Sequence, residues 1–77
     1  MAYDEDKFRR IVIETLRIST ASYKPDLRLG DIEEWDSVAH LDLVAAIEKA
    51  FGIRLTVDEM VELTGLDELR ARIKQAP

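Results

Sequence analysis

The residues from Ser37 to Phe51 carry apolar side chains at helical spacing and run into a glycine, and this segment constrains the fold most. The apolar positions are Val38, Leu41, Val44, Ile47 and Phe51, with Leu43 and Ala46 widening the stripe. A stripe this wide is typical of a helix that is buried at the centre of a small domain. Gly52 suits the left-handed conformation that ends many helices, and Ile53 can fold back onto it. We therefore predict a central helix over residues 37–51.

Three further segments have helical signals. Residues 5–18 show apolar side chains at helical spacing, with Asp4 as the expected cap and acids in the first turn. Thr56 and Glu59 have the spacing of a capping box, which predicts a short helix over residues 57–63. We predict a last helix that begins at residues 64–67, with Leu66, Leu69 and Ile73 on its apolar face. Its later residues include Arg70, Arg72 and Lys74, whose positive charges the helix dipole favours near the carboxyl end. No strand alternation is present, so we predict an all-α, antiparallel four-helix bundle that forms one domain over residues 1–77.

Residues 19–36 form the break between the first two helices. Pro25 and Gly30 interrupt this segment, and a few apolar residues (Tyr23, Leu27, Leu29 and Ile32) are available to hold it against the core. A loop of this length is unusual in so small a domain, and such loops are generally functional or disordered. This one leads directly to Asp36 and Ser37.

Length and charge exclude several classes of function. A chain of 77 residues buries a small core and leaves little room for a deep substrate pocket, which argues against an enzyme. The net charge of −5 argues against nucleic acid as a partner, and residues 31–50 carry all of that excess, with six acids and one lysine. No membrane-spanning run, signal peptide or cysteine is present, so we expect an intact soluble domain in the cytoplasm. The acidic segment is either a solvated surface or a face that steers positively charged partners.

Ser37 has several possible roles. Asp36 or Ser37 can cap the helix, which is worth about 1 kcal/mol. A hydrolase pair of Ser37 with His40, three residues on, is disfavoured because the chain offers no oxyanion loop, and we expect His40 to be solvated or at an interface. The acids Glu33, Glu34 and Asp36 do not have calcium-loop spacing and would hold magnesium only loosely. A serine at an exposed helix start also suits a covalently attached phosphodiester, which the helix dipole favours.

The segment WDSVAHLDLVAAIE from Trp35 to Glu48, followed by Phe51-Gly52-Ile53, resembles the acyl carrier protein family. In that family an Asp-Ser-Leu motif opens the second helix, and the likeness extends over the whole chain. The resemblance implies that a phosphopantetheinyl transferase attaches 4′-phosphopantetheine from coenzyme A to Ser37, assisted by Asp36. The thiol of this arm would hold an acyl or aminoacyl group as a thioester. Trp35 in this position resembles stand-alone carriers of specialised pathways, and we expect its ring to fold onto the loop.

The same resemblance implies a monomeric carrier that is not an enzyme and that visits a loading ligase and downstream synthase or transferase enzymes. On the family pattern the second helix would present Val38, Asp42, Ala45 and Glu48 to these partners. Leu41, Val44, Ile47 and Phe51 would face the core. Val38 replaces the usual Leu or Met, and Lys49 stands where many members carry an acid. The alternative is an unmodified interaction module that uses the acidic face for docking.

Overall fold

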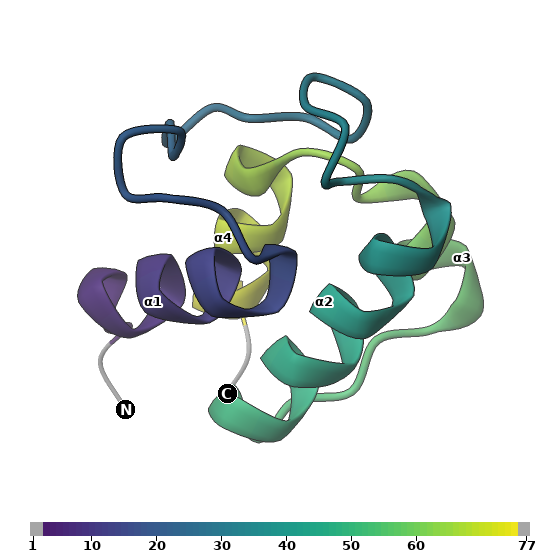
Figure 1. Ribbon diagram of the computed structural model, residues 1–77. Helices are drawn as coiled ribbons and strands as arrows, with labels where there is room; N and C mark the ends of the chain where they lie inside the picture. The colour runs from purple at the N-terminus through teal and green to yellow at the C-terminus, as the bar shows by residue number, and fades with distance from the viewer. Residues whose placement is uncertain (1–2, 76–77) are drawn as a thin grey trace.

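The computed structural model describes residues 3–75 and contains four helices (Figure 1). They are α1 (Glu5–Leu16), α2 (Ser37–Phe51), α3 (Val57–Glu62) and α4 (Leu66–Gln75). Within residues 3–75 there is no strand, and the one β-bridge, between Arg28 and Gly65, is isolated. The predicted all-helical class is therefore confirmed, as are the predicted bounds of α2.

The ends of the helices follow from their caps. The Asp4 carboxylate accepts a hydrogen bond from the Lys7 N–H at 3.1 Å, which confirms the predicted cap of α1. At the other end Arg17 adopts a left-handed conformation with φ of 57°, and the Ile18 N–H donates to the Ile13 carbonyl. This turn ends α1 at Leu16, two residues before the predicted boundary. The expected capping box of α3 is present, and that helix ends at Glu62 rather than at residue 63.

The core lies where α1, α2 and α4 meet, and the long loop completes it. Phe8 and Val12 of α1 are fully buried, as are Leu43 and Ile47 of α2. The other buried apolar side chains are Leu16, Ile18, Leu27, Trp35, Val44, Leu55, Leu66, Leu69 and Ile73. Since Ile18, Leu27 and Trp35 all belong to the segment between α1 and α2, this segment is a part of the core and not only a connection.

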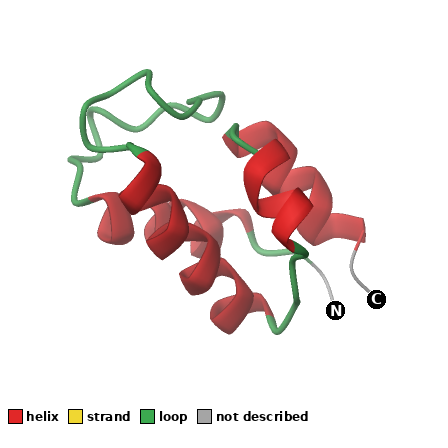
Figure 2. Cartoon of the chain, turned by 90° about the vertical axis from the view of Figure 1, so that its right-hand side faces the viewer, coloured by secondary structure: helices red, strands yellow, loops and turns green. Residues whose placement is uncertain are grey.

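Backbone hydrogen bonds hold the loop between α1 and α2 over one end of the helices (Figure 2). The Leu29 N–H donates to the Thr64 carbonyl at 2.8 Å, and the Leu66 N–H donates to the Leu27 carbonyl at 2.9 Å. These two bonds fasten the middle of the loop to the junction between α3 and α4. The loop then returns to the start of α2, and so the packing of the bundle sets the position of Ser37.

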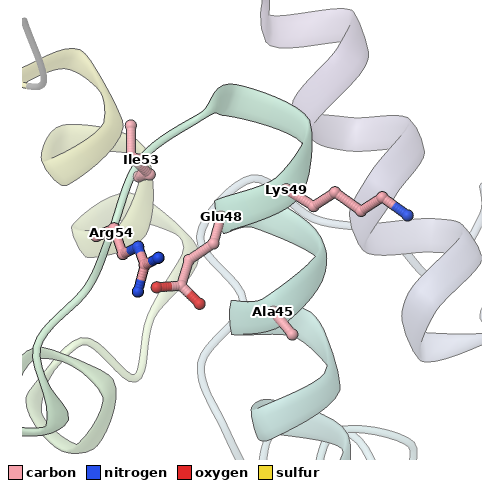
Figure 3. A pocket seen from close by; sticks show the side chains of 5 residues that line it. All are labelled: Ala45, Glu48, Lys49, Ile53 and Arg54. Atoms are coloured by element: carbon pink, nitrogen blue, oxygen red, sulfur yellow. The ribbon is translucent and has the colours of Figure 1, made fainter.

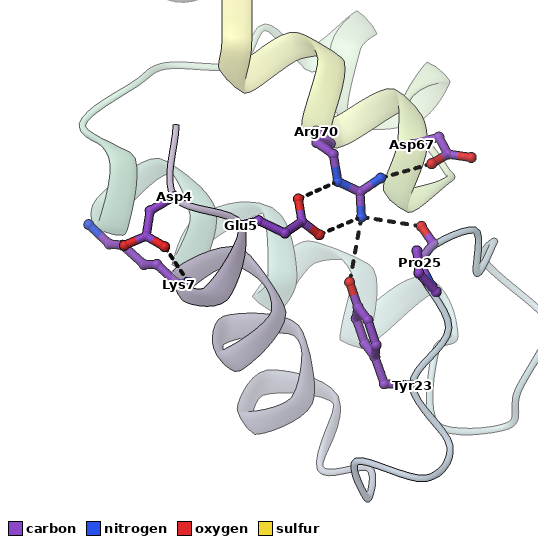
Figure 4. Close-up of polar contacts among 7 residues, drawn as sticks. All are labelled: Asp4, Glu5, Lys7, Tyr23, Pro25, Asp67 and Arg70. Atoms are coloured by element: carbon purple, nitrogen blue, oxygen red, sulfur yellow. Dashed lines mark hydrogen bonds and ion pairs between the residues drawn. The ribbon is translucent and has the colours of Figure 1, made fainter. Parts of the chain in front are cut away.

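The guanidinium of Arg70 joins α1, the loop and α4 (Figure 4). It donates to both oxygens of Glu5 at 2.8 and 3.2 Å, to Asp67 at 2.8 Å and to the Pro25 carbonyl at 3.3 Å, and it lies over the Phe8 ring. Burial opposes ionisation of Glu5, but the hydrogen bonds to its carboxylate and the positive charges of Arg70 and Lys74 together outweigh it, so the pKa of Glu5 lies below its ordinary value of 4.5. We expected Arg70 to interact with the helix dipole, whereas its side chain makes long-range contacts.

Candidate functional site

At the start of α2, Asp36 caps the helix and Ser37 exposes its side chain. The Asp36 carboxylate accepts a hydrogen bond from the Ala39 N–H at 2.8 Å, so Asp36 is the cap of the helix. Ser37 is the first helical residue, and its side chain is exposed. Within residues 3–75 its hydroxyl has no hydrogen-bond partner. The cap therefore leaves the Ser37 hydroxyl available to other molecules.

Trp35 and His40, on either side of this pair, are buried and bonded to each other. The Trp35 ring is 0% exposed, and its Nε1 donates to His40 Nδ1 at 3.1 Å. His40 is 5% exposed, and its Nε2 lies 2.8 Å from the Met60 carbonyl oxygen in α3. Because an indole N–H only donates and a carbonyl only accepts, these partners assign the imidazole proton to Nε2. The expectation that His40 is solvated or at an interface is wrong, and neither ring nitrogen is available to activate Ser37.

The buried stripe of α2 differs from the expected one. His40, Leu43, Val44 and Ile47 are buried, whereas Leu41 is 60% exposed and Val38 is 70% exposed. The expectation that Leu41 faces the core is therefore wrong. The error has a geometric cause, because a repeated spacing of three residues rotates by about 60° per step on a helix of 3.6 residues per turn. Over the three steps from Val38 to Ile47 the side chains turn by about 180° around the helix axis, so Val38 and Ile47 lie on opposite faces of α2.

The four residues expected to meet partners do not have equivalent environments. Val38, Asp42 and Ala45 are exposed, whereas Glu48 is half-buried and its Oε2 accepts a hydrogen bond from the Leu55 N–H at 2.8 Å. Glu48 thus stabilises the turn that follows α2.

Glu48 also lines a shallow cleft of about 290 Å³ with Ala45, Lys49, Ile53 and Arg54. In Figure 3 its carboxylate points to the side of Arg54, and Lys49 extends in the opposite direction. This end of α2 consequently has a mixed charge and is not part of a continuous acidic face.

Two exposed residues of α3 were missed by the sequence analysis. Val57 is 74% exposed and Val61 is 70% exposed, and together with Val38 and Leu41 they are the exposed large apolar side chains found in residues 3–75. Val57 and Val61 are four residues apart and share a face of α3, which is the signal that was available in the sequence. Exposed large apolar side chains on α2 and α3 make both helices candidates for binding other proteins.

The conformation of α3 depends on Glu59. Its side chain accepts a hydrogen bond from the Thr56 N–H at 2.9 Å and pairs with Arg72 of α4. These interactions, with the backbone bond from Thr56 the largest, lower the pKa of Glu59. Within the described part of the chain, no group of three or more acids or histidines is arranged to hold a metal ion, and this includes the acids before Ser37.

A small helical domain that exposes a serine hydroxyl at the start of its central helix, beside acidic and apolar side chains, has the features expected of a carrier protein. The family model described as "Phosphopantetheine attachment site" matches residues 6–73. The chain therefore belongs to this family of phosphopantetheine-bearing carrier proteins.

Curated relatives agree with this assignment. The chain is 28% identical over 65 residues to polyketide-8 synthase acyl carrier protein 2 of Streptomyces avermitilis, a match that covers 84% of the chain and 75% of the relative. It is 33% identical over 67 residues to acyl carrier protein MbtL of Mycolicibacterium paratuberculosis, covering 87% and 75%. It is 35% identical over 57 residues to acyl carrier protein AcpXL of Rhizobium meliloti, covering 74% of the chain and 60% of that relative.

The family defines the general function. The protein carries an acyl or aminoacyl group on covalently bound 4′-phosphopantetheine, and carriers of this family are generally not catalytic. The exposed hydroxyl of Ser37 fits this prosthetic group, because a phosphodiester requires a free hydroxyl that a transferase can reach. When bound, the group supplies the thiol that this cysteine-free chain lacks. No helix within residues 3–75 is long and apolar enough to cross a membrane.

Proposed function

We propose that Ser37 is the residue that receives 4′-phosphopantetheine. The observation that carries this proposal is that Asp36 caps α2 and leaves the adjacent Ser37 hydroxyl exposed. In the transfer, the Ser37 oxygen forms a new bond to the phosphorus that bears the pantetheine, and the pyrophosphate bond of coenzyme A breaks. The adenosine bisphosphate part leaves, and the hydroxyl proton passes to a base of the transferase.

The start of α2 favours the product of this transfer. The positive end of the helix dipole stabilises a negative group at the first turn by about 0.3–1 kcal/mol at an exposed position. Glu33, Glu34 and Asp36 partly oppose this effect by repulsion. In our proposal Asp36 assists the transfer by capping α2, which holds the main chain at Ser37, and its carboxylate would be available to the magnesium ion that the transferase uses.

The proposed partners are a phosphopantetheinyl transferase, a ligase that loads the cargo, and downstream synthase or transferase enzymes. We propose that they dock on Val38, Asp42 and Ala45 of α2, with Leu41 added because it is exposed. Glu48 stays at the edge of this surface, since its carboxylate is bonded to the Leu55 N–H. The proposal includes one carrier domain that acts as a monomer in the cytoplasm, and light scattering of the purified protein tests the monomeric state.

Intact-protein mass spectrometry tests the attachment site. The unmodified protein is incubated with coenzyme A, magnesium and a promiscuous phosphopantetheinyl transferase, and the mass gain of one phosphopantetheine is measured. We expect a complete gain on the wild type, no gain on Ser37→Ala, and an undiminished gain on Ser22→Ala, which changes another exposed serine. A full gain on Ser37→Ala, or none on the wild type with several transferases, would refute the assignment.

A further inference from the structure

A chain of two side-chain hydrogen bonds links the loop, α2 and α3 through residues on either side of Ser37. It begins at the Trp35 indole in the loop, passes through the His40 imidazole in α2 and ends at the Met60 carbonyl in α3, with lengths of 3.1 and 2.8 Å. Both rings are buried and lie nearly parallel, with centroids 5.9 Å apart and an angle of 29° between them. Attachment chemistry at Ser37 does not require a buried histidine, so this arrangement calls for a separate explanation.

The first hydrogen bond fixes the backbone on both sides of Ser37. Trp35 lies two residues before the serine, and His40 lies three residues after it. A bond between their side chains closes a short loop of chain that contains Asp36 and Ser37. The bond from the Ala39 N–H to Asp36 and the bond from the Gly30 N–H to the Trp35 carbonyl restrain the same segment. Ser37 is thus exposed, but its main chain has little freedom to move.

The second hydrogen bond holds α3. This helix has six residues and no fully buried side chain, and within residues 3–75 Met60 is its one apolar side chain that packs, partly buried, against the core. Within residues 3–75, the bond from His40 to the Met60 carbonyl is the one side-chain hydrogen bond between α2 and α3. The ion pair of Glu59 with Arg72 holds α3 to α4 instead. His40 therefore ties α3 directly to α2 and helps to fix the position of Val57 and Val61.

We propose that His40 is a positioning residue for the attachment reaction, acting through both of its hydrogen bonds. Through Trp35 it holds Ser37 in the orientation that the transferase requires, and through Met60 it holds α3 so that Val57 and Val61 meet the transferase together with α2. The serine and the two halves of the docking surface then reach the enzyme in one fixed arrangement. This inference rests on the proposed role of Ser37.

The two hydrogen bonds are separated by comparing Trp35→Phe with His40→Phe. Trp35→Phe removes the bond between Trp35 and His40 and leaves His40 bonded to Met60, so we expect kcat for loading to fall by about threefold to tenfold with KM unchanged. His40→Phe removes both bonds and leaves the Trp35 N–H and the Met60 carbonyl without partners. We therefore expect the same loss in kcat together with a KM that is raised by about threefold or more.

The assay measures loading from coenzyme A by a promiscuous transferase, with the carrier concentration varied, at a temperature where circular dichroism shows every variant folded. Val12→Ala is the matched control, because it shortens a fully buried side chain in α1 that takes no part in the hydrogen bonds of Trp35 and His40. We expect it to lower the melting temperature and to leave kcat and KM unchanged. If Trp35→Phe and His40→Phe behave like this control, the inference is overturned, and Ser37 remains the attachment site. Absence of loading on the wild type refutes the attachment site itself.

A measurement on the wild type covers the case in which His40→Phe does not fold. Nitrogen-15 NMR of the imidazole distinguishes its two nitrogens. We expect the proton on Nε2, with Nδ1 as acceptor, and an indole N–H of Trp35 that exchanges slowly with water. A proton on Nδ1, or an indole N–H that exchanges at the rate of an exposed one, overturns the inference.

Discussion

Asp42 and Glu48 are two acids of α2 that look equivalent in the sequence, and the structure predicts opposite effects when each is replaced by alanine. The Glu48 carboxylate accepts a hydrogen bond from the Leu55 N–H at 2.8 Å, in a half-buried position. Removing it leaves that N–H without its partner, at a cost of about 1–3 kcal/mol. Asp42 is exposed and has no hydrogen-bond partner within the described residues. Its replacement should change stability by less than about 0.5 kcal/mol.

Alanine has a higher helix propensity than either acid, which stabilises both variants by a few tenths of a kcal/mol, roughly, and offsets part of the loss. We therefore expect a net loss of about 1–2 kcal/mol in Glu48→Ala, a value that overlaps the range of about 1.5–3 kcal/mol for a hydrogen bond to a charged group. For a domain of this size, 1 kcal/mol corresponds to about 4–8 °C in the melting temperature. Glu48→Ala should thus melt about 4–16 °C below the wild type, and Asp42→Ala within about 4 °C of it.

The loading rate should be affected by Asp42→Ala and hardly by Glu48→Ala, which is the reverse of their effects on stability. An exposed charge at a docking surface acts mainly on the rate of association, and salt weakens its effect. We expect Asp42→Ala to slow loading by a partner with a basic surface at low salt, and the difference from the wild type to shrink in 0.5 M salt. Glu48→Ala, assayed where it is folded, should load at close to the wild-type rate. Thermal melting followed by circular dichroism, together with loading rates at two salt concentrations, is measured for both variants and the wild type. Equal losses of stability in the two variants would show that the Glu48–Leu55 bond contributes nothing.

Three further predictions concern other parts of the fold. Arg17→Gly should raise the free energy of unfolding in urea by about 0.5–1 kcal/mol, because glycine adopts the left-handed conformation of residue 17 without steric cost; lower stability would mean that the Arg17 side chain makes a contact that outweighs this cost. Arg70→Met should lower stability at pH 7 and flatten its dependence on acid. The pKa of the Glu5 carboxyl is depressed in the folded state, so its ion pair with Arg70 stabilises the fold above the unfolded pKa of 4.5, and this stabilisation is lost as the pH falls through the folded pKa. In urea titrations, the free energy of unfolding should fall more from pH 7 to pH 3 in the wild type than in Arg70→Met. Equal falls in the two proteins would contradict this. Val61→Ser should leave the melting temperature within about 3 °C of the wild type and raise KM for loading, whereas an unchanged KM would exclude Val61 from docking.

The sequence was sufficient for features that depend on near neighbours. The caps at Asp4, Thr56 and Gly52 need residues no more than four positions away, and all three were predicted and are present. The end of α1 was not, because no glycine or proline marks Arg17, which takes the left-handed conformation despite its side chain. Family resemblance, not periodicity, identified Asp36 and Ser37 as the candidate site.

Features that depend on distant partners were missed. A histidine is stable in a core only when its nitrogens find partners. Those of His40 come from Trp35 in the loop and from Met60, twenty residues further on. No sequence pattern within α2 predicts that Trp35 or Met60 is a hydrogen-bond partner of His40. The sequence therefore favoured the apolar Leu41 as the buried residue and the polar His40 as the exposed one.

The wrong predictions for Leu41 and His40 have one cause, which is that α2 is rotated about its axis relative to the orientation expected from the sequence. His40, Leu43, Val44 and Ile47 follow the spacing of a single helical face, and they are the buried side chains of α2. Val38, Leu41, Asp42 and Ala45 follow the same spacing two residues earlier, and they are exposed. Two residues correspond to about 200° around a helix, so the two faces are nearly opposite. Burying His40 is therefore what turns Leu41 outward beside Val38, and the hydrogen bonds of His40 to Trp35 and Met60 stabilise the rotation that gives the docking face its apolar residues.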